Sequence, residues 1–269
     1  MQRLQQAIEQ KNTFMASLYL AEFFQPSLDI TNHIQQVEYF IRGAFKVINK
    51  EGEVELKLKQ LLDYFYGDLA FTSDENQLFS PNYNFLDKVI DYRTGIPITL
   101  SVLLCQVGRA VGLRMQEVAF PGHFLIRVEV TDQRYWYIDP LTGHRLEWQQ
   151  LEHLYHVMTD EEPEALPHEL LQPASCEETV IRMLHSIKAS LINEGMLHQA
   201  LSCSELLLQL SPDDPYERRD RGFLLHQLDC PQLALEDYHF FVEKCPSDPI
   251  TELLKAHMNN IQVSEVVLH

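Results

Sequence analysis

The sequence predicts an α+β domain followed by an all-α region of helical hairpins, and two observations lead to this fold class. Apolar residues recur at helical spacing as far as Gly112, and the period then shortens to that of β-strands. Further along the chain, small residues and prolines recur with an offset of 34 residues. We therefore expect two domains, residues 1–176 and residues 177–269.

The helices that precede the strands form a predicted N-terminal layer. Apolar residues at intervals of three and four predict helices within residues 1–25, 31–48 and 54–65. No Gly or Pro interrupts the first of these segments before Pro26. A further long helix begins at Pro97, because proline is well tolerated in the first turn, and its apolar face extends to Val111.

Three short segments rich in β-branched and aromatic residues predict strands at residues 115–120, 123–130 and 134–140. Pro121 and Gly122 separate the first two segments. Polar residues 131–133 separate the last two, which we expect to form a hairpin. Strands that follow several helices favour an α+β fold over a doubly wound sheet.

Residues 146–181 contain no Lys or Arg and are rich in Asp, Glu and Pro, so we expect a partly ordered acidic connector that packs through Leu151, Leu154 and Tyr155. After it, three pairs of residues are each 34 positions apart: Ala200 and Ala234, Pro212 and Pro246, and Pro215 and Pro249. This period resembles the tetratricopeptide repeat, whose helical hairpins stack into a groove that holds a peptide or a helix.

Three residues depart from the repeat pattern, since Lys188, Ser204 and Arg218 stand where such repeats usually place small or large apolar residues. The resemblance nevertheless implies a protein or peptide partner for the repeat region. A purely structural role, in which the repeats support the first domain, is the alternative.

Charge and cysteine content exclude several classes of function. The formal net charge of −18 disfavours binding to nucleic acid or to anionic membranes. The N-terminus lacks the apolar core of a secretory signal, so we expect a cytoplasmic protein. The five cysteines are scattered without zinc-finger spacing, which favours reduced thiols and predicts neither a cofactor nor a metal site.

His123 and Asp139 are the candidate catalytic pair. If the hairpin turns at Thr131, these residues lie directly opposite each other on one face of the sheet. A carboxylate beside an imidazole sets its tautomer and stabilises the imidazolium, as nucleophile–His–Asp catalysis requires. The same face carries Arg127 and Tyr137, which we expect to line a cleft.

The order of three segments, TGIPITLSVLLCQVGRAVGL, PGHF and YIDPLTG, resembles the transglutaminase-like core, which has a papain-type fold. Together with the repeats, it is similar to the bacterial SirB-type family. The resemblance covers roughly residues 30–145 and 180–250 and is carried by Arg93, Gly95, Ile96, Pro97, Gly112, Pro121, Gly122, His123, Asp139, Pro140 and Gly143. It implies a transglutaminase-like antiparallel sheet.

Active members of that superfamily carry a nucleophilic Cys at the start of the central helix, where the helix dipole favours a thiolate. The equivalent position in this sequence is occupied by Pro97. Cys105 is eight residues further along, about 12 Å along the helix axis, which favours a buried apolar role. Arg93 and Thr99 would also lie near the cleft.

Two functions follow from these observations. The first is a non-catalytic adaptor or regulatory protein that binds another protein through its repeats. The second is an amide or ester hydrolase or transferase that uses His123 and Asp139 with an atypical nucleophile. The sequence leaves the oligomeric state and the identity of the partner or substrate open.

Overall fold

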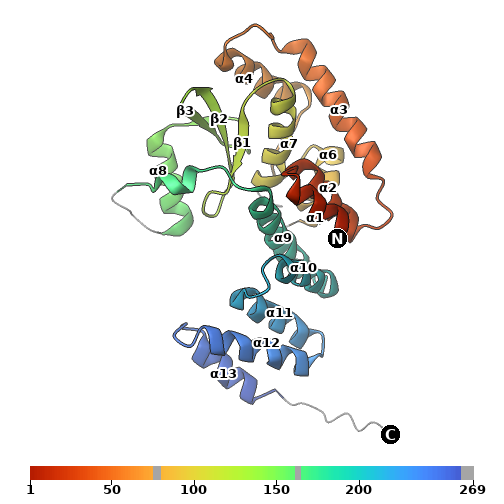
Figure 1. Ribbon diagram of the computed structural model, residues 1–269, viewed down its shortest axis with the longest axis vertical. Helices are drawn as coiled ribbons and strands as arrows, with labels where there is room; N and C mark the ends of the chain where they lie inside the picture. The colour runs from red at the N-terminus through yellow and green to blue at the C-terminus, as the bar shows by residue number, and fades with distance from the viewer. Residues whose placement is uncertain (75–79, 161–164, 262–269) are drawn as a thin grey trace. The chain divides into compact units, whose positions relative to one another are not determined.

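The computed structural model describes residues 1–74, 80–160 and 165–261, which divide into two compact units, Met1–Met183 and Leu184–His269 (Figure 1). The division falls inside α9 (Cys176–Asn193), the helix that begins at the expected boundary residue. Helices and a small antiparallel sheet form the first unit, and the described elements of the second are helices. The α+β prediction is therefore confirmed.

The helical elements described before the sheet are α1 (Gln2–Glu9), α2 (Thr13–Phe24), α3 (Ile30–Val47), α4 (Val54–Leu62), the π-helix η1 (Asp63–Asp68), α5 (Pro81–Asn84), α6 (Leu86–Tyr92) and α7 (Pro97–Ala110). The break between α1 and α2 was not predicted. It occurs at Lys11, which adopts the left-handed conformation with φ +55°. The side chain of Asn12 then accepts the Met15 N–H at 3.1 Å and begins a new helix.

In the described part of the chain, the sheet has four antiparallel strands in sequence order: β1 (Met115–Val118), β2 (Leu125–Thr131), β3 (Arg134–Ile138) and β4 (Arg145–Leu146). The first three confirm the predicted strands, and β4 was not predicted. Each predicted strand is shorter than expected. As a result His123 lies just before β2 and Asp139 just after β3.

The predicted hairpin register is wrong by two residues. Ile126 pairs with Ile138 and Arg127 with Tyr137, and the register shifts between Glu129 and Thr131. The turn lies at residues 132–133, beyond Thr131, because Thr131 pairs with Arg134, and the irregularity changes the register by one more residue. Because side chains alternate with a period of two, a shift of two residues keeps every side chain on its predicted face.

Both faces of the sheet are covered, since α7 lies on one side and α8 (Trp148–Thr159) on the other (Figure 1). On the α7 side, Ile126, Val128 and Ile138 join the main core of the first unit. On the α8 side, a second cluster contains Val118, Phe120, Leu125, Leu151, Tyr155, Leu166 and Leu171. The residues expected to anchor the acidic connector therefore do so. Residues 161–164 of the connector lie outside the described residues.

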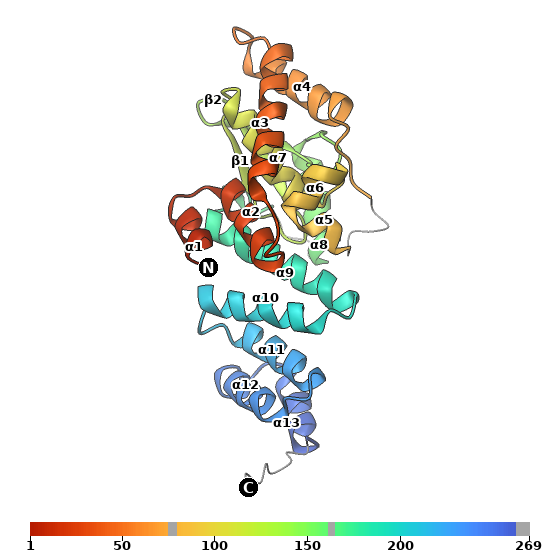
Figure 2. The same ribbon diagram turned by 90° about the vertical axis from the view of Figure 1, so that its right-hand side faces the viewer.

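The second unit contains the helical hairpins that the 34-residue offset predicts. After the short 3₁₀-helix His168–Leu171 and α9, the elements are α10 (Leu197–Leu210), α11 (Pro215–Gln227), α12 (Pro231–Lys244) and α13 (Thr251–Asn259). Figure 2 shows α10 to α13 stacked one after another. Ala200 and Ala234 are fully buried, as the close approach of two helices requires.

Candidate functional site

His123 is held by the tight turn that enters β2. Gly122 adopts φ +64°, and a Cβ at this position would come within 2.9 Å of Met158. The backbone N–H of His123 donates to the Phe120 carbonyl at 3.1 Å. The guanidinium of Arg182 donates to the carbonyls of Phe120 and His123 at 3.2 and 3.3 Å. The imidazole is thus fixed in place and is only 8% exposed.

Asp139 lies in hydrogen-bond contact with His123, since its Oδ1 is 3.2 Å from the imidazole Nε2. The same carboxylate accepts the Leu141 N–H at 3.0 Å and the Thr142 hydroxyl at 3.2 Å. Burial by itself would raise the pKa of Asp139, but these hydrogen bonds, with that of His123 the strongest, hold the pKa below its ordinary value. Asp139 is therefore an ionised carboxylate beside the imidazole.

The other residues expected around a cleft are placed differently. Tyr137 packs into the cluster under α8, and the Arg127 guanidinium lies 4.2 Å from the Tyr135 ring and 2.9 Å from Gln116 Oε1. Both side chains are on the predicted face, but α8 and its neighbours cover that face. Arg127 and Tyr137 are half-buried, and their expected role in lining a cleft stays a prediction.

Arg93 and Thr99 have structural contacts of their own. The Arg93 guanidinium lies 4.2 Å from the Phe40 ring and 5.1 Å from the Phe71 ring, and burial lowers its pKa. Thr99 is fully buried, and its Oγ1 accepts the Ile96 N–H at 3.1 Å, which caps α7. The structure does not place Thr99 on an open surface.

The start of α7 carries hydroxyl groups that are already committed to backbone carbonyls. The Thr99 hydroxyl is 3.1 Å from the carbonyls of Ile96 and Tyr83, and the Ser101 hydroxyl donates to the Pro97 carbonyl at 2.7 Å. Cys105 is fully buried in mid-helix, and burial raises its pKa far above the ordinary value. Neither the hydroxyls nor the thiol resembles an activated nucleophile.

A cleft of about 550 Å³ lies beside the loop that follows Asp139. One wall comes from α4 and the π-helix, and the other from β3 and the loop that leads into β4; the lining residues are Glu55, Leu58, Lys59, Leu62, Asp63, Tyr66, Gly67, Trp136, Ile138, Thr142, Gly143, His144 and Arg145. The Tyr66 hydroxyl joins the two walls, because it donates to the Pro140 carbonyl at 2.7 Å.

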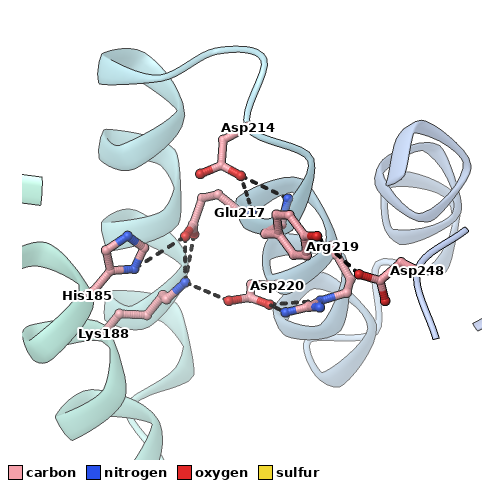
Figure 3. Close-up of polar contacts among 8 residues, drawn as sticks. His185, Lys188, Asp214, Glu217, Arg219, Asp220 and Asp248 are labelled. Atoms are coloured by element: carbon pink, nitrogen blue, oxygen red, sulfur yellow. Dashed lines mark hydrogen bonds and ion pairs between the residues drawn. The ribbon is translucent and has the colours of Figure 1, made fainter. Parts of the chain in front are cut away.

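In the second unit, a buried ion cluster replaces apolar packing between α9 and α11. Figure 3 shows the Lys188 ammonium pointing toward Glu217 and Asp220; it lies 2.7 and 2.9 Å from the two Glu217 carboxylate oxygens and 3.1 Å from Asp220 Oδ2. His185 Nδ1 is 3.7 Å from Glu217. Arg218 likewise pairs with the buried Asp237 at 3.2 Å. Two departures from the repeat pattern are therefore ion pairs.

An apolar groove lies between α11 and α13 of the same unit. Phe223, Ile250, Leu253, Leu254 and His257 line about 230 Å³ of it. Phe223 is 39% exposed and Leu253 70% exposed, although both are large apolar side chains. Exposed apolar side chains that gather in one groove are typical of an interaction surface rather than of a solvated helix face.

Residues 1–74, 80–160 and 165–261 contain no group of three or more His, Cys, Asp or Glu side chains placed to hold a metal ion. Within the same ranges, none of the helices has the length and apolar character needed to span a membrane.

Comparison with known families agrees with this geometry. The family model described as "Transglutaminase-like superfamily" matches residues 29–185. The chain belongs to this superfamily. A tetratricopeptide repeat model matches residues 187–259, the helices of the second unit.

Curated relatives of this transglutaminase-like chain extend over nearly its whole length. The UPF0162 protein YchA of Escherichia coli K12 is 36% identical over 91% of this chain and 89% of its own. Protein SirB1 of Salmonella typhimurium LT2 is 36% identical over 87% of each chain. A UPF0162 protein of Vibrio cholerae is 33% identical over 88% of this chain and 87% of its own. No solved structure matches the chain.

Sequence reasoning missed two residues that shape the site of this transglutaminase-like core. Arg182 comes from α9, 59 residues after the His123 carbonyl that it contacts, and no local motif indicates this contact. Tyr66 contacts Pro140 across 74 residues. The π-helix on which Tyr66 lies gives no pattern distinct from that of an α-helix, so only the tertiary structure identifies it.

Proposed function

We propose that the protein is a non-catalytic, cytoplasmic adaptor or regulatory protein that binds another protein through its repeat unit. The observation that carries this proposal is the apolar groove between α11 and α13, in which Phe223 and Leu253 remain exposed. The first unit supports the proposal for two reasons. Active members of the superfamily carry the nucleophilic Cys at a position that Pro97 occupies in this chain, and the nearby hydroxyl groups of Thr99 and Ser101 are hydrogen-bonded to backbone carbonyls.

Charge defines the partner further. Residues 184–261 contain twelve Asp or Glu and six Lys or Arg, so their formal net charge is −6. The cations of this stretch are already occupied: Lys188, Arg218, Arg219, Arg221 and Lys255 pair with carboxylates, and Lys244 lies 5.6 Å from the Phe240 ring. We therefore expect a segment with an apolar anchor flanked by Lys or Arg.

The test uses full-length protein as bait for a displayed peptide library, followed by calorimetry with the selected synthetic peptides. Leu253→Ser removes an apolar wall of the groove, and Leu233→Ser is the matched control, since Leu233 is 51% exposed on α12 and does not line the groove. Basic peptides with an apolar anchor should bind the control and lose at least about tenfold in affinity on Leu253→Ser. Equal affinity for both variants would refute the proposal that the peptide binds in this groove.

A second candidate function, amide or ester hydrolysis, rests on the contact between His123 and the ionised Asp139. Such an enzyme would use water or an unusual nucleophile, with His123 as the general base. A screen of ester and amide substrates with the wild type and His123→Ala tests it. Turnover that His123→Ala abolishes while the far-ultraviolet circular dichroism is unchanged would favour the enzyme over the adaptor.

A further inference from the structure

The cleft between α4, the π-helix and the loop into β4 combines charges of both signs with an apolar floor. Lys59 is flanked one turn away on each side by Glu55 and Asp63, and all three line the cleft. In the described part of the chain, none of these three forms an ion pair with another side chain. A solvated ammonium between two solvated carboxylates leaves charge of each sign available to a ligand.

The opposite wall is held rigidly by Asp139. Its backbone N–H donates to the His144 carbonyl at 2.9 Å, and its carbonyl accepts the Gly143 N–H at 2.8 Å. Its carboxylate also accepts the Thr142 hydroxyl. Gly143 adopts φ +72°, and a Cβ there would come within 2.6 Å of the Tyr66 ring. The loop is therefore fixed against the π-helix, and His123 supports it through Asp139.

An aromatic group completes this wall. The Arg145 guanidinium lies 4.2 Å from the Trp136 ring and 2.9 Å from Glu147. Trp136 Nε1 is buried and has no hydrogen-bond partner among the described residues. Leu58, Leu62 and Ile138 supply apolar surface in the same cleft.

These features select one class of ligand. A polyanion near Lys59 would also meet the carboxylates of Glu55 and Asp63, which disfavours phosphates and nucleotides. A zwitterion satisfies both signs at once. Charged groups four residues apart on a helix are separated by about 6 Å along the axis, and the termini of an extended dipeptide are separated by about 7 Å. The volume of the cleft is within the range of small-molecule sites.

We propose that this cleft binds a short zwitterionic peptide of dipeptide length. Its carboxylate pairs with Lys59, its ammonium pairs with Glu55 or Asp63, and its apolar side chains contact the floor and Trp136. His123 and Asp139 then act as positioning residues that keep the 142–145 wall in place. The proposal does not depend on the repeat groove, because the lining residues of the two sites are in different units.

The chain offers a built-in reporter, since it contains two tryptophans, Trp136 in the cleft and Trp148 on α8. In full-length Trp148→Phe protein, the tryptophan emission comes from Trp136 alone. We would titrate this protein with leucylleucine, with its N-acetylated and C-amidated forms, with free leucine and with inorganic phosphate, and repeat the titrations by calorimetry.

Leucylleucine should give saturable binding, and blocking either terminus should weaken it about tenfold. Lys59→Met should weaken binding of the free dipeptide by the same factor and leave the affinity for the C-amidated form unchanged. The control Lys57→Met removes the same charge from the same helix without touching the cleft, and it should change neither affinity. Gly67→Leu should block binding without disturbing the fold, since nothing lies within 4 Å of a Cβ at Gly67.

Several results would overturn the proposal. Absence of saturation with leucylleucine up to about 10 mM by both methods would do so, and so would unchanged affinity in Gly67→Leu. Phosphate that competes with the dipeptide would show an anion site instead. Free leucine that binds as tightly as the dipeptide would refute the dipeptide length. Peptide binding at the repeat groove would be unaffected in each of these cases. Failure of this proposal is therefore distinguishable from failure of the proposed function.

Discussion

The buried Lys188 ammonium is the feature of the repeat unit whose removal should have the largest effect. Its partner Glu217 is only 2% exposed, so Lys188→Met leaves a carboxylate out of water without its main counter-charge. Breaking a buried pair in this way typically costs 3–5 kcal/mol. Asp220 is a second carboxylate in the cluster, and its repulsion of Glu217 is no longer screened by the ammonium. We therefore expect a loss of about 4 kcal/mol.

The loss should be measured by urea unfolding and by hydrogen exchange of peptides from α9 and α11, because a chain with two units need not unfold in one step. Lys255→Met is the matched control, since it breaks an exposed pair with Glu252 and should cost less than about 1 kcal/mol. Equal midpoints for Lys188→Met and Lys255→Met, with equal exchange in α9, would refute the reasoning.

The pH dependence of this loss has a defined sign. Burial raises the pKa of Glu217 above its ordinary value, although Lys188 partly offsets this. A raised pKa means that the folded state binds the proton more tightly, so stability from this group is greatest at low pH and is lost as pH rises through the folded pKa. Without Lys188 the pKa rises further. The deficit of Lys188→Met should therefore shrink on acidification, and a deficit that grows would contradict the assignment.

Three further predictions concern the first unit. Asp139→Asn should lower the free energy of unfolding by about 2 kcal/mol at neutral pH, because it removes a charge-assisted hydrogen bond to His123. Since the pKa of Asp139 is lowered in the folded protein, the wild type should lose this advantage below about pH 4. Urea midpoints measured against pH would show the loss, and a difference that stays constant with pH would contradict it. Gly143→Ala should lower the free energy of unfolding by roughly 1–3 kcal/mol through strain at φ +72°. Gly67→Ala should change the thermal unfolding midpoint little. Equal shifts in midpoint for the two variants would refute the close approach of Gly143 to Tyr66. Cys105 should resist alkylation in the folded protein until it unfolds, and rapid labelling found by peptide mapping would contradict its burial.

Local patterns predicted most elements of the fold, and the exceptions have physical causes. The 3.6-residue period identified α3, α4 and α7, and short segments rich in β-branched and aromatic residues identified the first three strands. The break between α1 and α2 was missed because it depends on a left-handed Lys11 and a capping Asn12, neither of which interrupts the apolar pattern. The hairpin register was wrong because the turn lies at residues 132–133 and an irregularity follows Glu129, and alternation reveals neither.

The site was predictable to the extent that it depends on neighbouring segments. His123 and Asp139 come together because two consecutive strands bring them to the same end of the sheet, and the contact survives the two-residue error in register. Thr99 was placed near the cleft but caps its own helix instead. A residue type at a position does not reveal which of its hydrogen bonds the backbone has already taken.

The sequence by itself determined most of the order of helices and strands and the 34-residue repeat, because these are properties of local spacing and residue identity. Only the tertiary structure decided which charges are buried and which surfaces are open. Lys188 and Glu217 are 29 residues apart, and Tyr66 and Pro140 are 74 apart. Such contacts depend on how whole helices pack, which the spacing along one helix does not specify.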